Sequence, residues 1–257
     1  MSTYETVGKF LVITPAFSAA DGLFAFTTLA QQQDGSVASF KARHDEASRR
    51  ELEAALAPLQ LSWLKLEHAN RVARIPEELQ DPESLKAQAQ SIFADAVIIA
   101  RPGYTAAFTT ADCLPIIIAS QGQQLIAGIH AGWRGIASGV ISNCCAEFIH
   151  ASGGLPPDTQ VWIGPSIAAK DYEIDADTRR LLLKNPLLNT GQLSPARPGH
   201  YFADLRAMAC TQLEAAGIKP EWISVQPVST YAESRFHSAR RDGDKSGRMA
   251  TVIGILA

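Results

Sequence analysis

Four short apolar runs follow one another between residues 96 and 130, with no helical pattern among them. They cover residues 96–101, 106–110, 114–119 and 125–130, and each is rich in β-branched side chains. Runs that are apolar on both faces are typical of strands buried on both sides. Because no helix separates these strands, we expect mixed sheets with hairpins rather than a doubly wound parallel sheet.

Further strands and helices are predicted on either side of this block. The other strand-like runs cover residues 10–14, 23–28, 61–66, 160–163 and 249–256. Helical periodicity and capping residues predict helices over 48–57 with Ser48 as N-cap, from Asp81 and Pro82 to residue 93, and over 135–152, 176–183 and 205–216. The fold class is therefore α/β of the α+β type, with mixed β-sheets packed together and flanked by helices.

Length and composition predict a globular protein with one large domain or two small ones. Hydrophobic residues make up 46% of the chain, which is enough for a sizeable core. The net charge of −3 offers no electrostatic driver for nucleic-acid binding. No run approaches the ~20 apolar residues of a membrane span, and the N-terminus does not resemble a signal peptide. With only four cysteines, we expect a reducing, cytoplasmic location.

Three histidine and cysteine residues are the first candidates for chemistry. Cys113 opens one apolar run and His130 ends the run after the next, so the two can meet across a hairpin. His68 also ends an apolar run. Thiolate and imidazole suit zinc, and three dispersed ligands leave a fourth position open, as in catalytic sites. Two alternatives stay open: Cys113 as a thiol nucleophile with His130 or His68 as its base, and Cys113 as a buried small hydrophobe.

Other polar residues near these segments are candidates for substrate binding or proton transfer. Arginine suits phosphate, and tryptophan can stack on a base. Asp112 is a candidate for orienting a ligand histidine, and His44 and His237 for acid or base roles. The candidates for substrate binding are Arg134, Trp133, Arg240, Arg241 and Arg248.

Several motifs together resemble the YfiH family, which is also labelled multicopper polyphenol oxidase or laccase-like, and purine nucleoside phosphorylase. The most specific are ADCLPI at residues 111–116, HAGWRG at 130–135, and RRDG at 240–243 followed by Gly247-Arg248. FADAV at residues 93–97, Ile163-Gly-Pro165, Tyr172-Glu-Ile174 and Asp204-Leu205 also agree with the family. The resemblance runs from about residue 20 to the C-terminus.

The resemblance implies a single domain over residues 1–257, a metal site and an activity. It implies that His68, Cys113 and His130 bind the metal, which would be zinc, with copper also possible. It implies a zinc-dependent purine nucleoside phosphorylase with adenosine deaminase and methylthioadenosine phosphorylase activities, acting on a purine nucleoside and phosphate as a monomer or homodimer. A role as an amidase that edits peptidoglycan precursors, using Cys113 or the metal, is an alternative.

The sequence also departs from the family pattern. The usual QVHG around the first ligand is LEHA at residues 66–69, and the usual N-terminal NLGxHxGD segment is SFKARHDE at residues 39–46. The late Cys-Thr pair of the family is Ser229-Thr230 here. A copper phenol oxidase is a further alternative, but six histidines without an H-x-H pair are too few for several coppers. The last alternative is a binding module that senses a metal or a nucleoside without catalysis.

Overall fold

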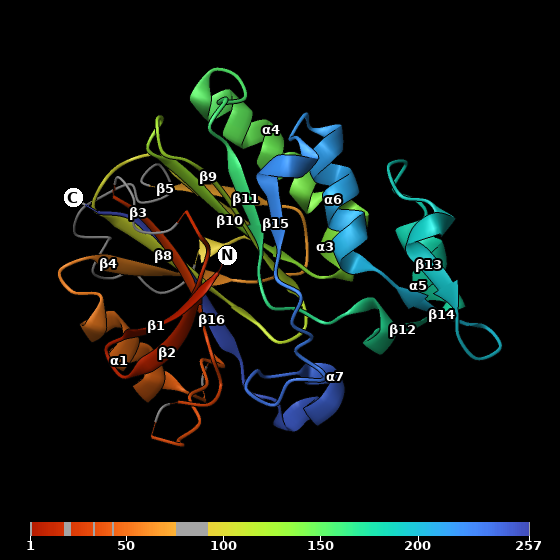
Figure 1. The fold of residues 1–257 in the computed structure, drawn as a ribbon, viewed down its shortest axis with the longest axis horizontal. Helices are drawn as coiled ribbons and strands as arrows, with labels where there is room; N and C mark the ends of the chain where they lie inside the picture. Colours follow the sequence, from red (N-terminus) through yellow and green to blue (C-terminus); the bar gives the residue numbers. More distant parts are fainter. Residues whose placement is uncertain (1, 18–21, 33, 43, 76–91, 257) are drawn as a thin grey trace.

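The computed structural model describes residues 2–17, 22–32, 34–42, 44–75 and 92–256. Its first sheet has seven strands in the order β1-β2-β3-β16-β8-β4-β6 (Figure 1). These strands are β1 (Thr3–Val7), β2 (Phe10–Thr14), β3 (Leu23–Thr28), β16 (Met249–Ile255), β8 (Tyr104–Thr110), β4 (Gln60–Lys65) and β6 (Ile92–Phe93). The pairings are antiparallel except at β4, which runs parallel to both β8 and β6.

The second sheet has six strands and is mixed as well. Its order is β15-β11-β9-β10-β7-β5. The strands are β15 (Ile223–Val225), β11 (Gln160–Ile163), β9 (Leu114–Ser120), β10 (Leu125–Ala131), β7 (Ala96–Ile99) and β5 (Val72–Ile75). Strands β9 and β10 form the expected hairpin, and β7 pairs antiparallel with β10 on its other side.

The two sheets pack face to face and share one core. On β9 and β10, alternate side chains such as Ile117 and Ile126 enter the core that also holds Phe108 of β8 and Ile253 of β16. The packing between the sheets is close at Gly128, where an added Cβ would lie 2.8 Å from Phe108 Cε1 and 3.1 Å from Ile253 Cδ1. A larger residue there would push the sheets apart, because close-packed interiors have no spare volume.

Helices cover the outer faces of both sheets (Figure 1). The other side chains of β9 and β10 pack under three helices, α3 (Trp133–Ser138), α4 (Val140–Ser152) and α6 (Leu205–Ala215). Helix α1 (Glu46–Ala55) packs through Leu52 onto the outer face of the seven-stranded sheet. This double burial explains why the runs of the central strands are apolar on both faces.

A third, smaller sheet lies beside α3 and α6 (Figure 1). It has the strand order β12-β14-β13. The strands are β12 (Glu173–Asp175), β14 (His200–Ala203) and β13 (Leu193–Pro195), with α5 (Ala176–Leu182) between β12 and β13. The remaining short elements are α7 (Ala239–Asp242) and the 3-10 helices Ala169–Asp171, Thr190–Gln192, Pro220–Trp222 and Gly243–Lys245.

The expected fold class is confirmed, with corrections at particular elements. The predicted helix over 135–152 is two helices that meet at Gly139, which has a φ of 83°. The first helix begins at Glu46, so Ser48 is not its N-cap. Phe93 lies in strand β6 and not at a helix end, and the rest of that predicted helix, at 81–91, lies outside the described residues. Six short strands, β1, β5 and β12–β15, were not expected.

Among the described residues, no helix has both the length and the apolar character needed to cross a membrane.

Candidate metal centre

Strand register brings Cys113 close to His130. His130 is the next-to-last residue of β10 and lies opposite Pro115 of β9. Cys113 lies just before β9, in the turn that connects it with β8, and therefore at the same end of the hairpin. The sequence expectation that these two residues meet across a hairpin is confirmed.

His68 comes from the loop between β4 and β5. Its backbone is left-handed, with a φ of 57°, which is uncommon for a residue with a side chain. Its ring meets that of His130 edge to face, with 4.9 Å between centroids and 89° between planes. The donor atoms of His68, Cys113 and His130 all lie within 4.8 Å of one another.

Asp95 is a fourth residue of the site, and it was not among the predicted site residues. Its carboxylate is 1% exposed and accepts a hydrogen bond from His130 Nδ1 at 2.9 Å. It also accepts from the backbone N–H groups of Glu67, His68 and Ala69 at 3.1, 3.0 and 2.9 Å. The contact with a candidate ligand histidine, which the sequence suggested for Asp112, is made by Asp95. The Asp112 carboxylate instead accepts from Thr230 Oγ1 and from the backbone N–H of Arg240.

The thiol and imidazole of the site perturb one another strongly. Burial disfavours the charged form of Cys113, but His130 and His68 outweigh it and lower the pKa of Cys113 to about 6. Burial also opposes the charge on His130, while Cys113 and Asp95 raise the pKa of His130 to about 9. Without a metal, the pair is therefore a thiolate beside an imidazolium over the window between these values.

Small residues next to the trio allow this close approach. A Cβ at Gly132 would lie 2.8 Å from Cys113 Sγ and 3.6 Å from His68 Cδ2. A Cβ at Gly135 would lie 3.3 Å from the backbone oxygen of Ala69, in the His68 loop. The glycines of the HAGWRG segment thus make room for the Cys113 thiol and for the His68 loop.

The donor set fits a single metal ion. Two imidazole nitrogens and a thiol sulfur are ligands that zinc prefers, and three protein ligands leave a coordination position open. Within the described part of the chain, these three residues are the only group of three or more histidine, cysteine or acidic donors close enough to hold a metal.

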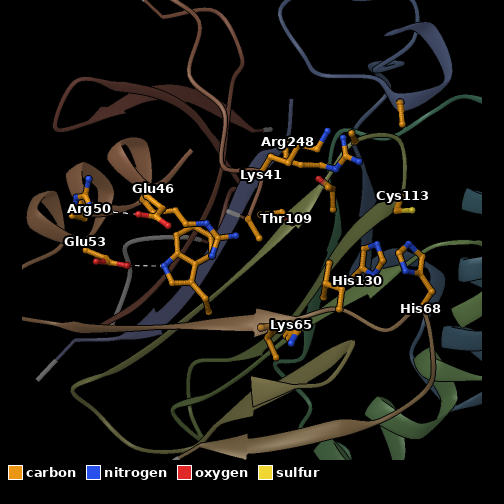
Figure 2. Close-up of a pocket in the computed structure, with 18 residues that line it drawn as sticks. Lys41, Glu46, Arg50, Glu53, Lys65, His68, Thr109, Cys113, His130 and Arg248 are labelled. Atoms are coloured by element: carbon orange, nitrogen blue, oxygen red, sulfur yellow. Dashed lines mark hydrogen bonds and ion pairs between the residues drawn. The ribbon is translucent and has the colours of Figure 1, made fainter. Parts of the chain in front are cut away.

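The trio lies at one end of a large cavity with a volume of about 1010 Å³. Figure 2 shows His68, Cys113 and His130 at one end, and the α1 residues Glu46, Arg50 and Glu53 at the other. The charged residues of the lining are mainly cationic, because they comprise five lysine and arginine residues and two glutamates. The lining residues that carry a charge are Lys41, Glu46, Arg49, Arg50, Glu53, Lys65 and Arg248.

Of the substrate-binding residues predicted from the sequence, Arg248 is the one that lines this cavity. Its guanidinium donates to the backbone oxygens of Ser246 and Gly247. Trp133 packs against the core under the guanidinium of Arg134, which lies 4.4 Å from its ring centroid. Arg240 stacks on Tyr172 and donates to the backbone oxygen of Glu173.

The other arginine and histidine candidates also contact protein groups. Arg241 donates to the backbone oxygens of Thr230, Tyr231 and Phe236 and to the Asp242 carboxylate. His237 is buried, and its Nε2 lies 2.8 Å from the backbone oxygen of Ala38. His44 is exposed and is not part of the described cavity lining. The sequence missed Lys41 and Lys65 because nothing in the chain order places them beside Cys113. Thr110, three residues before Cys113, was not among the predicted site residues either.

The lowered pKa of Cys113 predicts its reactivity in the metal-free protein. A thiol with a pKa of about 6, instead of the ordinary 9.0, stays a reactive thiolate as the pH falls from 9 to 7 and loses reactivity only near pH 6. Alkylation of Cys113 by iodoacetamide, followed by mass spectrometry, is therefore expected to have its midpoint near pH 6. Cys145, whose pKa burial raises to about 12, is the internal control and is expected to stay unmodified. A midpoint near pH 9 for Cys113 would contradict this electrostatic picture.

Comparisons with known proteins agree with the motifs and the fold. Residues 36–256 match the family model described as multi-copper polyphenol oxidoreductase laccase. A Xylella fastidiosa protein named purine nucleoside phosphorylase is 34% identical over 194 residues, which are 75% of this chain and 71% of that protein. The Escherichia coli protein named purine nucleoside phosphorylase YfiH is 31% identical over 218 residues, which are 83% and 82% of the two chains.

Two solved structures have the same fold over nearly the whole chain. The crystal structure of YlmD from Geobacillus stearothermophilus superposes with a TM-score of 0.84 at 24% identity, covering 100% of both chains. The Bacillus licheniformis hypothetical protein YfiH superposes with a TM-score of 0.83 at 22% identity, covering 98% of both chains. By its family model, its relatives and its fold, the chain belongs to the YfiH family, whose model carries the polyphenol oxidoreductase laccase description.

Proposed function

We propose that this protein is a zinc-dependent purine nucleoside phosphorylase that uses His68, Cys113 and His130 as metal ligands. The observation that carries the proposal is the trio itself. It lies at one end of a cavity that is large enough for a nucleoside and has five lysine and arginine residues in its lining. The names of the Xylella and Escherichia relatives support this substrate class. Adenosine deaminase and methylthioadenosine phosphorylase activities belong to the same proposal, because they act on the same class of nucleoside.

The residues of the cavity suggest how the substrates would bind. In phosphorolysis, a phosphate oxygen forms a bond to the anomeric carbon of the ribose while the bond to the base breaks. Arg248 and Lys41 are neighbours, because the backbone N–H of Phe40 donates to the backbone oxygen of Arg248. We assign these two cations to phosphate, since guanidinium and ammonium groups are the usual phosphate donors.

A buried hydroxyl offers a contact for the nucleoside. Thr110 is 1% exposed and lines the cavity, and its Oγ1 has no hydrogen-bond partner among the described residues. Unpartnered buried polar atoms cost free energy, so Thr110 would gain a hydrogen bond from a polar group of the bound nucleoside. A bound zinc ion would supply a Lewis acid at this end of the cavity.

Turnover of adenosine tests the proposal. The purified protein, loaded with zinc, is incubated with adenosine with and without inorganic phosphate, and the products are separated by chromatography. Adenine and ribose-1-phosphate are expected only when phosphate is present, and inosine is expected in both reactions. Treatment with a chelator is expected to stop product formation, and added zinc to restore it. No product above the level of the chelated protein would refute the proposal.

The assignment of phosphate to Arg248 predicts a kinetic effect. A hydrogen bond to a charged group is worth about 1.5–3 kcal/mol, so Arg248→Ala is expected to raise the KM for phosphate roughly 10–100-fold. The KM for adenosine is expected to change much less. Arg180→Ala is the matched control, because Arg180 is exposed on α5 and pairs with Asp177. Equal phosphate KM values for the two variants would contradict the assignment.

The arrangement of Cys113, His130 and Asp95 favours a second candidate, an amidase that edits peptidoglycan precursors. A thiol beside an imidazole that a carboxylate orients is the arrangement of cysteine hydrolases. In this case, chelated protein would still release the amine from an amide substrate, and Cys113→Ala would not. The cytoplasmic location, the single domain and the monomeric or homodimeric state stay predictions.

A further inference from the structure

One buried carboxylate contacts both the ring of His130 and the loop that carries His68. Asp95 lies directly before β7, and β7 pairs antiparallel with β10 so that Ala96 faces Ile129. This register puts Asp95 beside His130, where its backbone oxygen also accepts the backbone N–H of His130 at 2.7 Å. Its side chain also reaches the loop that connects β4 of the seven-stranded sheet with β5 of the six-stranded sheet.

The Asp95 carboxylate holds the His68 loop through three consecutive backbone N–H groups. Oδ2 accepts from Glu67 and Ala69, and Oδ1 accepts from His68. Three neighbouring N–H groups can point to one anion only when the chain bends sharply, and His68 has a left-handed φ of 57° in the middle of this bend. Such a backbone conformation is unfavourable for a histidine and persists when surrounding contacts fix it.

The fourth hydrogen bond determines which nitrogen of His130 is available. Asp95 Oδ1 lies 2.9 Å from His130 Nδ1. A carboxylate only accepts, so this contact requires a proton on Nδ1 and leaves the lone pair of Nε2 for a metal. All four hydrogen bonds therefore end on two oxygens that are withdrawn from solvent, and their geometry sets the position of one histidine and the tautomer of the other.

On the basis of the proposed metal site, we infer that Asp95 is the positioning residue of that site, fixing the His68 loop and the orientation of His130 together. Asp95 does not contact the metal or the substrate in this role. It acts as a common anchor for the His68 loop and for the ring of His130.

The Asp95→Asn variant tests this inference because it changes acceptors into donors with little change in volume. The amide keeps one acceptor oxygen, and its NH₂ group faces N–H donors that it cannot bond. Competition with a chromogenic chelator is expected to give a zinc affinity about 10–100-fold weaker than that of the unmodified protein, as for other groups that orient metal ligands. In the metal-free protein, the amides of residues 67–69 are expected to exchange with solvent hydrogen faster.

Asp158→Asn is the matched control. The Asp158 carboxylate also organises a loop, by accepting from Ser120 Oγ and the Gly122 N–H at 2.7 Å each, but it lies at the opposite end of β9. Zinc affinity and the exchange of residues 67–69 are expected to be unchanged in Asp158→Asn. Zinc affinity in Asp95→Asn equal to that of this control would overturn the inference.

The conservative variant Asp95→Glu keeps the inference testable if Asp95→Asn folds poorly. The hydrogen-exchange data distinguish failure of the proposed metal site from failure of the anchoring role of Asp95. Asp95→Glu keeps the acceptor oxygens at a different reach, and it is expected to bind zinc more tightly than Asp95→Asn but more weakly than the unmodified protein. If Asp95→Asn does not fold, zinc binding by Asp95→Glu equal to that of the unmodified protein overturns the inference. If the unmodified protein binds no zinc, the proposed metal site fails, whereas unchanged exchange at residues 67–69 in Asp95→Asn refutes the anchoring role itself.

Discussion

Replacing Cys113 with alanine is expected to remove zinc binding and to lower the turnover of adenosine by about 10²–10³-fold. The thiolate is one of three donors, so its loss leaves two histidines, and a metal in catalysis contributes several kcal/mol of transition-state stabilisation. Zinc content is measured by atomic emission after dialysis, and turnover is measured by chromatography of the bases. The fold is expected to survive, because Cys113 is only partly buried and lies in a turn.

Two further cysteine variants serve as controls for Cys113→Ala. Cys210→Ala removes a partly buried thiol on α6, outside the described cavity lining, and is expected to keep zinc and activity. Cys113→Asp places a carboxylate ligand where the thiol was, and a carboxylate can bind zinc but cannot act as a thiol nucleophile. Partial recovery of zinc and of phosphorolysis in Cys113→Asp supports the metal mechanism. Activity in Cys113→Ala that needs no metal would contradict both roles of Cys113.

Much of the site could be predicted because its strands are local in sequence. Cys113 and His130 belong to one hairpin, and two apolar runs separated by a short turn already indicate that their ends meet. His68 was a candidate from its place after an apolar run, and the family motifs selected it. Its proximity to the other two depends on how two different sheets pack, which no short-range pattern reveals.

Asp95 shows why the rest could not be read from the sequence. It lies in the FADAV segment that resembles the family, yet its role depends on the pairing of β7 with β10 and on the bend of the His68 loop. Asp112 is adjacent to Cys113 in sequence, but its carboxylate turns to Thr230 and Arg240. The position of Asp112 next to Cys113 in the sequence was therefore misleading. The register between β7 and β10 determines which carboxylate lies beside His130.

The residues that line the cavity were also hard to predict, because they come from distant parts of the chain. Its cations come from α1 and the segment before it, from β4 and from the loop before β16, and these three regions lie far apart in the chain. The sequence picked Arg248 because it belongs to a family motif, and it missed Lys41 and Lys65 because neither belongs to one. The prediction of a single helix over 135–152 was wrong for a local reason. Gly139 takes a left-handed conformation that ends one helix and begins the next.

Phe108→Ala is expected to have the largest effect on stability, about 3–5 kcal/mol of the free energy of unfolding, as for other large aromatic truncations in cores. Phe108 is fully buried in the core between the two large sheets, where an added Cβ at Gly128 would lie only 2.8 Å from its ring. The surrounding strands are held in place by their backbone hydrogen bonds, so they cannot move in to fill the space that the Phe108 ring leaves. Urea unfolding of the metal-free protein measures the change.

Phe93→Ala is the matched control, because Phe93 is 44% exposed on β6 and its truncation leaves no internal cavity. A loss of unfolding free energy in Phe108→Ala no larger than in Phe93→Ala would contradict the packing of the two sheets. Phe108→Ala is also expected to bind zinc normally while folded, since it contributes no donor to the trio. Cys113→Ala should show the reverse, with little change in the urea midpoint of the metal-free protein and no zinc. The two variants together separate the scaffold formed by the sheets from the site at the end of their strands.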